Sequence, residues 1–223
     1  MTIVYHKEVI QGSEPWLAMR CGLLTSSEMR LIITPKKLEY AQNDKEKQHL
    51  YELAAQRVNK YVEPSYISDD MCRGMDDESY ARGTYHERYA PVETVGFVTN
   101  DRFGFTLGYS PDGLIGDAGQ IECKSRRQKY QMQTISTDEI PEEYIIQLQT
   151  GLIVSQREWV DFISYCGGMP MFVKRVYPDA KIQDAIKKVA AMFHEKLEKV
   201  IAEYAGKTKN LIPTERIARE ISL

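Results

Sequence analysis

The sequence lacks the cysteine and histidine clusters that are typical of zinc sites and redox-active dithiols. Its four cysteines stand far apart in the chain, at Cys21, Cys72, Cys123 and Cys166. Its four histidines form neither a close pair nor an HExxH motif. We therefore interpret the cysteines as reduced structural thiols and expect no histidine-based metal site.

Long apolar runs are also missing from the sequence. No stretch approaches the roughly 18 consecutive apolar residues that a membrane-spanning helix requires. The chain starts with MTIVYHKEVIQG, which lacks the apolar core of a secretory signal. We therefore expect a protein without membrane contact that resides in the cytoplasm.

A strong net charge of either sign is absent too. The 223 residues include 29 lysines and arginines against 32 aspartates and glutamates, which gives a formal net charge of −3. Because no protein-wide basic field attracts polyanions, any contact with nucleic acid must be local. With 43% hydrophobic and 27% charged residues, the composition is typical of a soluble globular protein and argues against a disordered or fibrous chain.

Hydrophobic periodicity and capping residues predict an alternation of helices and strands. Helices are expected over 13–20, 25–34, the second half of 38–61, 77–90, 141–155 and 181–204. Strands are expected over 96–99, 102–109, 120–125, 158–165 and 171–177, with the loop SPDGLIGDAG joining the second and third as a hairpin. This order favours an α/β (α+β) fold with one mixed sheet flanked by helices. We expect a single domain over 1–223, with a core at about 16–177 followed by the amphipathic helix and a tail.

The most informative stretch is Ser110-Pro111-Asp112-Gly113, followed by Glu122-Cys123-Lys124. Alternate side chains of a strand share a face, so Glu122 and Lys124 point together while Cys123 points into the core. A hairpin that brings Asp112 beside Glu122 makes two carboxylates converge, and they repel each other unless a cation or a proton lies between them. Such hard oxygen ligands favour Mg²⁺ or Mn²⁺, and Lys124 would then hold or deprotonate the attacking water or offset charge on a phosphate.

The same residues also fit an ordinary turn and the solvated face of a hairpin. An aspartate followed ten residues later by E-x-K is a short pattern, and charged residues often alternate on strands. The motif alone does not decide between these two interpretations.

Four sequence blocks in a fixed order resemble one nuclease family. They are WLAMRCGLLTSSEM at 16–29, the G-x3-E motif at 83–87, SPDGL through IECKS at 110–125, and Y-x2-Q-x-Q at Tyr144, Gln147 and Gln149. In type and spacing these blocks are similar to those of the phage lambda exonuclease, or YqaJ-like viral recombinase, branch of the PD-(D/E)xK nuclease superfamily. The resemblance covers about 16–154, which is most of the chain.

The resemblance implies a restriction-endonuclease-like core and a role for each matching residue. It makes Asp112 and Glu122 carboxylate metal ligands, joined by the backbone carbonyl of Cys123, and makes Lys124 the catalytic lysine. Glu87, arriving from a helix, would complete the site near a second metal position. Two Mg²⁺ ions, or Mn²⁺ ions, would then stabilise both the attacking and the leaving oxygen of an in-line displacement.

The resemblance also implies a pocket for the terminal 5′-phosphate, formed by Arg20, Ser27 and Ser110. Thr25-Ser26-Ser27-Glu28 fits a capping box, so a helix beginning at Thr25 would add free amides beside Arg20. On local sequence alone, an ordinary helix cap and a surface arginine explain the same residues. Gln147 would orient the water or the scissile phosphate, and Tyr144 would support the wall of the site.

A second terminal-phosphate arginine of the family has no counterpart at the equivalent distance here. Its position falls near Tyr130, so we expect Arg126 or Arg127 to substitute for it. Both arginines belong to a basic cluster that would contact DNA phosphates or form a solvated strand end.

Taken together, the resemblance implies a Mg²⁺-dependent 5′-to-3′ exonuclease of linear double-stranded DNA that releases 5′-mononucleotides. It also implies a ring-shaped homotrimer threaded by DNA, a single-strand annealing partner, and a phage or prophage origin within a bacterial host cell. Alternatives are a PD-(D/E)xK endonuclease, a Cas4-like nuclease, and a catalytically inactive DNA-end-binding protein. The four scattered cysteines do not resemble an iron–sulfur ligand set, and all four expected catalytic residue types are present.

Overall fold

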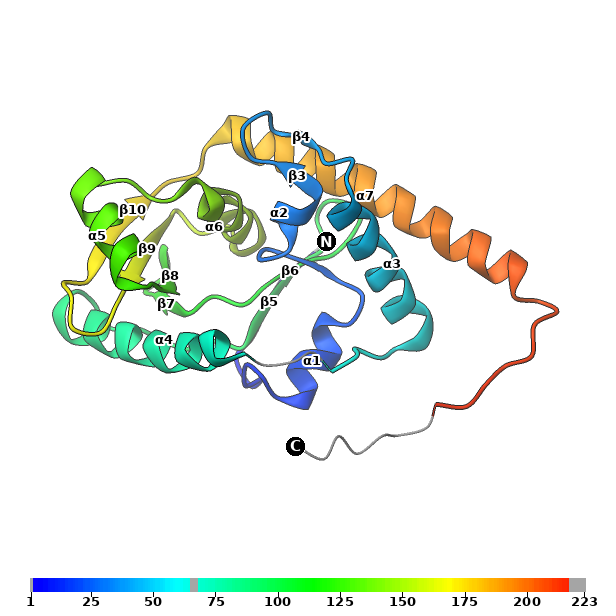
Figure 1. Cartoon of the computed structure of the whole chain (residues 1–223), viewed down its shortest axis with the longest axis horizontal. Coiled ribbons are helices and arrows are strands. Elements are labelled where there is room, and N and C mark those ends of the chain that lie inside the picture. Colours follow the sequence, from blue (N-terminus) through cyan, green and yellow to red (C-terminus); the bar gives the residue numbers. More distant parts are fainter. Residues whose placement is uncertain (1, 65–67, 217–223) are drawn as a thin grey trace.

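The computed structural model of the chain describes residues 2–64 and 68–216 (Figure 1). The helices are α1 (Glu14–Arg20), α2 (Met29–Ile32), α3 (Asp44–Asn59), α4 (Asp69–Arg88), α5 (Gln128–Thr137), α6 (Glu142–Ser155) and α7 (Ala180–Lys207). The strands are β1 (Ile3–His6), β2 (Leu24–Thr25), β3 (Ile33–Thr34), β4 (Glu39–Tyr40), β5 (Phe97–Asn100), β6 (Leu107–Tyr109), β7 (Gly113–Ile115), β8 (Gly119–Ser125), β9 (Trp159–Tyr165) and β10 (Phe172–Val176). The prediction of a mixed α/β fold with helices around mixed strands is confirmed.

The strands divide between two sheets rather than forming the single sheet expected from the sequence. Within the described residues, one four-stranded sheet has the order β1-β5-β6-β2 and the other the order β10-β9-β8-β7, and β3 and β4 form a separate pair. The first sheet shares the largest hydrophobic core with α2, α3, α6 and α7. In Figure 1, α7 runs along one side of the molecule, and α3 lies beneath it.

The second sheet is covered by helices on both faces. On one face, Ala81 and Tyr85 of α4 pack with Ile121 and Cys123 of β8. On the other face, α6 packs against the apolar side chains of β9. The central strand β8 is parallel to β9 and antiparallel to β7. Charged groups on β8 therefore lie between a helix and a sheet, where little water reaches them.

Local signals placed several helices correctly. Ser13 caps α1 by accepting a hydrogen bond from the amide of Trp16, as the sequence predicts. Glu142 and Glu143 occupy the first turn of α6, where the helix dipole favours acids. The expected apolar stripe of α7 is confirmed in its central part, where Ile186 and Phe193 are buried.

Other predictions about local structure are wrong. The helix expected over 25–34 is instead strand β2, a turn and the four-residue helix α2, because Thr25 pairs with Gly108 in the first sheet. The hairpin expected between 102–109 and 120–125 does not form, since β6 belongs to the first sheet and β8 pairs with β7 from inside the supposed loop. Strand β1 and helix α5 were not predicted, and α4 begins earlier than expected.

No helix in the described ranges has both the length and the apolar character needed to cross a membrane. Residues 217–223, the last part of the expected tail, lie outside the described residues.

Candidate active site

The hairpin of β7 and β8 brings Asp112 and Glu122 together at its open end. Gly113 pairs with Ile121 in an antiparallel register. Asp112, which precedes Gly113, therefore lies opposite Glu122, which follows Ile121. Asp112 Oδ2 accepts a hydrogen bond of 2.5 Å from the backbone amide of Cys123. Both carboxylates are buried. The convergence predicted from the strand pattern is therefore present.

Side chains of β8 alternate between the two faces, as predicted. Ile121 and Cys123 enter the apolar cluster beneath α4. Glu122 and Lys124 lie on the other face, and Lys124 Nζ is 2.7 Å from Glu122 Oε1. The register with β9 places Glu122 beside Phe162, on the face that α6 covers. The alternation thus separates the charged pair from the apolar cluster beneath α4.

Glu122 accepts hydrogen bonds from three protein donors. Lys124 and the side-chain amide of Gln147 both donate to Oε1, and the hydroxyl of Tyr109 donates to Oε2 at 3.0 Å. Tyr109 reaches this position because Gly151 on α6 leaves room for its ring; an added Cβ would stand 2.8 Å from the ring atom Cζ. The sequence indicated a site role for Gln147 but not for Tyr109, whose contribution depends on the packing of α6 against β6.

Burial and like charges dominate the electrostatics of the site. Burial, followed by the neighbouring charges of Glu122 and Glu78, raises the pKa of Asp112 well above its usual range. Burial alone would lower the pKa of Lys124, but the carboxylates of Glu122 and Asp112 outweigh it, and the net shift is upward. Lys124 is therefore held as a cation among acids that repel one another.

The acid that α4 contributes to this charge cluster is Glu78, not Glu87. Burial raises the pKa of Glu78, partly offset by Arg82, and Glu122 raises it further. Arg82 donates to Glu78 at 2.9 Å and to the backbone carbonyl of Asp112 at 3.2 Å. Glu87 lies nine residues after Glu78, and a rotation of about 100° per residue places it on the opposite face of the helix. Its side chain is exposed on that face. The prediction that Glu87 completes the site is not supported by this placement.

A signal for Glu78 was present in the sequence but was overlooked. The G-x3-E spacing occurs twice, at 83–87 and also at 74–78, where Gly74 is followed by Met75-Asp76-Asp77-Glu78. Only helix rotation distinguishes the two copies. Ala81 and Tyr85 face the β8 strand, and that face also presents Glu78.

The donor set suits a hard divalent cation with an incomplete protein shell. Among the described residues, no three histidine, cysteine, aspartate or glutamate side chains are grouped to hold a metal ion on their own. Mg²⁺ is commonly bound by one or two carboxylates, with waters and substrate phosphates completing its shell. Asp112 and Glu122 match that pattern, and the excess of buried negative charge beside Lys124 would be offset by a divalent cation.

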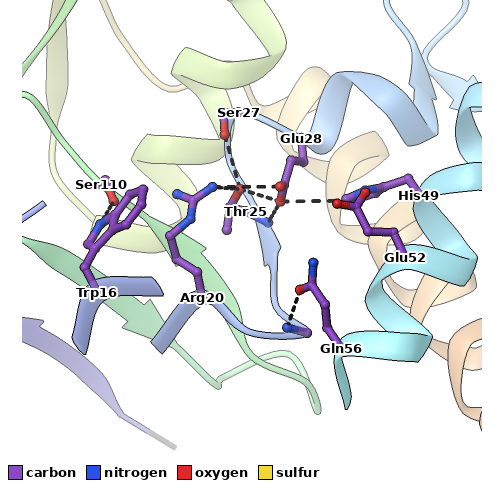
Figure 2. Close-up of polar contacts among 10 residues, drawn as sticks. Trp16, Arg20, Thr25, Ser27, Glu28, His49, Glu52, Gln56 and Ser110 are labelled. Carbon is purple, nitrogen blue, oxygen red and sulfur yellow. Dashed lines mark hydrogen bonds and ion pairs between the residues drawn. The ribbon is translucent and has the colours of Figure 1, made fainter. Parts of the chain in front are cut away.

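A second polar cluster surrounds Arg20 (Figure 2). The guanidinium of Arg20 stacks over the Trp16 ring at 4.4 Å, and Trp16 Nε1 donates to Ser110 Oγ at 2.9 Å. Arg20 also donates to Thr25 Oγ1 at 3.5 Å, and this oxygen is 3.2 Å from Ser27 Oγ. The structure therefore brings Arg20, Ser27 and Ser110 into one cluster, as predicted, and Ser110 stands two residues before Asp112 in the chain.

The expected helix start beside Arg20 is absent from this cluster. The helix α2 begins at Met29 and has four residues, so no extended helix dipole points at Arg20. Glu28 instead bonds the amide and the hydroxyl of Thr25. Any anion here would be held by side chains, with Arg20 as the cation.

Arg126 and Tyr144 adjoin the lysine, whereas Arg127 lies further out. Arg126 donates to the hydroxyl of Tyr144 at 2.6 Å and to Glu143 at 3.1 Å. Lys124 Nζ lies 5.6 Å from the centre of the Tyr144 ring, which supports the predicted wall. Arg127 is exposed at the start of α5. Of the two arginines expected to replace the missing phosphate ligand, Arg126 is the one packed at the site.

Comparisons with known proteins agree with this geometry. The model of the YqaJ-like viral recombinase domain matches residues 15–158. An alkaline exonuclease from Laribacter hongkongensis, LHK-Exo, is 30% identical, with a TM-score of 0.72 over 87% of this chain and 100% of that chain. Its structure in complex with dAMP has a TM-score of 0.73 with the same coverage and identity.

A phage-related exonuclease from Haemophilus somnus 129PT shares the fold. It is 14% identical, with a TM-score of 0.57 over 82% of this chain and 96% of that chain. None of the curated proteins matches the chain significantly.

Proposed function

Because the chain belongs to the YqaJ-like viral recombinase family and is a nuclease acting on DNA, we propose that it is a Mg²⁺-dependent 5′-to-3′ exonuclease. Its substrate would be linear double-stranded DNA with phosphorylated 5′ ends. Its products would be 5′-mononucleotides and a 3′ single strand suited to recombination by annealing. The structure of LHK-Exo in complex with dAMP is consistent with such a product, because dAMP is a deoxynucleoside monophosphate.

The observation that carries this proposal is the buried group of Asp112, Glu122 and Lys124, with Gln147 against it. Lys124 is held as a cation 2.7 Å from Glu122, where it can offset negative charge that develops on a scissile phosphate. Gln147 donates to Glu122 and is placed to orient the attacking water or the phosphate beside it. These side chains are fixed by neighbours before substrate arrives, which reduces the reorganisation needed during reaction.

Asp112, Glu122 and the carbonyl of Cys123 would hold the metal, with Glu78 near a second position. A bound divalent cation supplies Lewis-acid stabilisation to the reacting phosphate. Arg82 fixes Glu78 and the loop at Asp112 together by bonding both. Mn²⁺ would serve in place of Mg²⁺, since both prefer oxygen ligands.

Polarity would come from the Arg20 cluster. A terminal 5′-phosphate bound by Arg20, Ser27 and Ser110 would lie near Asp112, because Ser110 precedes it by two residues. Cleavage would then remove the first nucleotide of the bound strand. Arg126 and Tyr144 would contact DNA phosphates at the other side of Lys124, with Arg127 further along the strand.

A homotrimeric ring would explain how a chain with net charge −3 retains DNA. Enclosing the duplex replaces a strong protein-wide field, and a locally basic channel supplies the phosphate contacts. The ring would make degradation processive, and a single-strand annealing protein would receive the 3′ strand. A distributive monomer would contradict the ring.

The reaction is tested with linear duplex DNA that carries 5′-phosphates on both strands, incubated with Mg²⁺ or with a chelator. Metal-dependent release of 5′-mononucleotides from the 5′ ends alone is expected. A covalently closed circle serves as the control, since its cleavage would indicate an endonuclease. End binding without cleavage in the presence of Mg²⁺ would instead indicate a catalytically inactive end-binding protein.

Replacing Arg20 with alanine is expected to reduce the preference for phosphorylated ends. Loss of a charge-assisted contact to phosphate should lower kcat/KM on 5′-phosphorylated ends about 30-fold. Ends with a 5′-hydroxyl should be degraded at nearly the wild-type rate, because they have no charge for Arg20 to bind. Parallel kinetics on the two substrates measure the effect, and an unchanged preference would remove Arg20 from the phosphate pocket.

A further inference from the structure

A buried histidine lies behind the Arg20 cluster with one ring nitrogen unpaired. His49 on α3 is 3% exposed, and its Nε2 atom has no hydrogen-bond partner. Its Nδ1 atom is 3.2 Å from Glu52 Oε2, and its ring stacks on Phe193 of α7 with centroids 5.8 Å apart. Buried polar atoms are nearly always satisfied, so an unpaired one calls for an explanation.

The group facing this nitrogen is the carboxylate of Glu28. Glu28 Oε2 lies 4.0 Å from His49 Nε2, just beyond hydrogen-bond range (Figure 2). The same oxygen accepts bonds from Thr25, at 2.6 Å from the hydroxyl and 3.2 Å from the amide. Glu28 Oε1 is 3.8 Å from Arg20 Nη2. Glu28 thus stands between the buried imidazole and the arginine.

Helix α3 is also fastened to the loop that carries these residues. Gln56 accepts a 2.8 Å hydrogen bond from the amide of Gly22, and Arg57 Nε donates at 2.8 Å to the carbonyl of Gly22. These two bonds hold α3 against the segment between Arg20 and Thr25. The helix that carries His49 is therefore held against the loop that leads into Glu28.

A phosphate bound at Arg20 changes the balance of charge around Glu28. The phosphate takes over the guanidinium, and its negative charge repels the nearby carboxylate. Glu28 then loses the cation beside its Oε1 atom, while the unpaired nitrogen of His49 faces its Oε2 atom. An N–H group on the Nε2 atom of His49 can donate to Glu28.

We propose that Glu28 and His49 are positioning residues for the terminal 5′-phosphate. Glu28 aligns Arg20 before the phosphate binds and turns to His49 when it binds, so that the cluster accepts the anion without an unbalanced carboxylate charge beside it. The inference rests on the proposed function, because it requires a 5′-phosphate at Arg20. It assigns no chemical step to either residue.

The test compares KM and kcat on linear duplexes that differ only in a 5′-phosphate or a 5′-hydroxyl. His49→Phe keeps the ring stacked on Phe193 and removes the donor, whereas His49→Gln restores an N–H near the position of Nε2. We expect His49→Phe to raise KM for phosphorylated ends about tenfold with kcat unchanged, as for loss of a hydrogen bond to a charged group. His49→Gln should recover most of this loss, and neither variant should change KM for hydroxyl ends.

His194→Phe is the matched control. His194 also lies 4.0 Å from a glutamate, Glu198, and stacks on an aromatic ring, that of Phe105, but it belongs to α7 and faces Glu198 rather than Glu28. This variant should behave as wild type on both substrates. Thermal melting of each variant separates a loss of folding from a loss of phosphate recognition.

A double-mutant cycle covers the case in which His49→Phe folds poorly. Glu28→Gln keeps an oxygen that accepts from Thr25 but removes the charge that requires His49. It should weaken phosphate preference and make His49→Leu, which removes the donor with a smaller apolar side chain, silent on phosphorylated ends, which is the non-additivity expected of residues that act together. Equal effects of these variants on both kinds of end, or full additivity, would overturn the inference.

Arg20→Ala and the wild-type protein distinguish failure of the inference from failure of the proposed function. If Arg20→Ala abolishes the phosphate preference while His49→Phe retains it, the pocket stands and the positioning role is wrong. If the wild-type protein shows no preference for phosphorylated ends, the phosphate pocket is wrong, and the positioning role falls with it.

Discussion

Lys124→Ala is expected to lower kcat by about 10³-fold, the scale of losing a positioned proton-transfer or charge-stabilising group. The lysine lies 2.7 Å from Glu122, and the surrounding acids hold its pKa above the usual value, so it is held as a cation where we propose that the scissile phosphate binds. Removing it leaves negative charge on the phosphate unbalanced. Single-turnover release of mononucleotides measures this loss without interference from product release.

Folding and DNA binding must be followed alongside activity. Glu122 loses one of its donors in the variant but keeps Gln147 and Tyr109, so the fold should survive. Lys124→Met preserves most of the side-chain volume and should be equally inactive, which separates the charge from packing. Lys187→Ala removes a partly exposed lysine paired with Asp184 on α7 and should leave kcat unchanged. Full activity of Lys124→Ala would refute the assigned site.

Glu78→Gln and Glu87→Gln are expected to differ sharply although both glutamates belong to α4. Glu78 interacts electrostatically with Asp112 and Glu122, so its loss should lower activity about 100-fold, the scale seen when a supporting group of a metal site is removed. Glu87 is exposed on the opposite face, and its replacement should change activity less than about twofold, as for most surface changes.

The Mg²⁺ dependence of the rate shows how Glu78 acts. If Glu78 supports a metal position, Glu78→Gln should shift the Mg²⁺ concentration for half-maximal rate upward, and excess Mg²⁺ should restore part of the activity. The two variants have the same change in charge and the same helix, so each controls for the other. A large loss in Glu87→Gln with none in Glu78→Gln would mean that α4 presents its other face to the substrate.

The hairpin that brings the proposed metal ligands together was accessible from sequence because its determinants are local. Strand alternation separates Glu122 and Lys124 from Ile121 and Cys123, and a short connection between neighbouring strands brings Asp112 back to Glu122. The same holds for α1 and α6, whose caps and first-turn residues lie within a few positions of their starts. The resemblance to the nuclease family then used the order of the four sequence blocks, because no single block identifies a nuclease.

The sequence by itself determined that the chain is a nuclease, that Asp112, Glu122 and Lys124 converge, and where most of the helices lie. Tertiary structure decided which of two equally spaced glutamates faces the site, because the rotation of α4 depends on Ala81 and Tyr85 packing against β8. It decided that Thr25 lies in a strand, because pairing with Gly108 outweighs a local capping signal. It also brought Tyr109 to Glu122 and His49 to Glu28, since contacts between distant segments depend on how helices pack and leave no periodic trace in the chain.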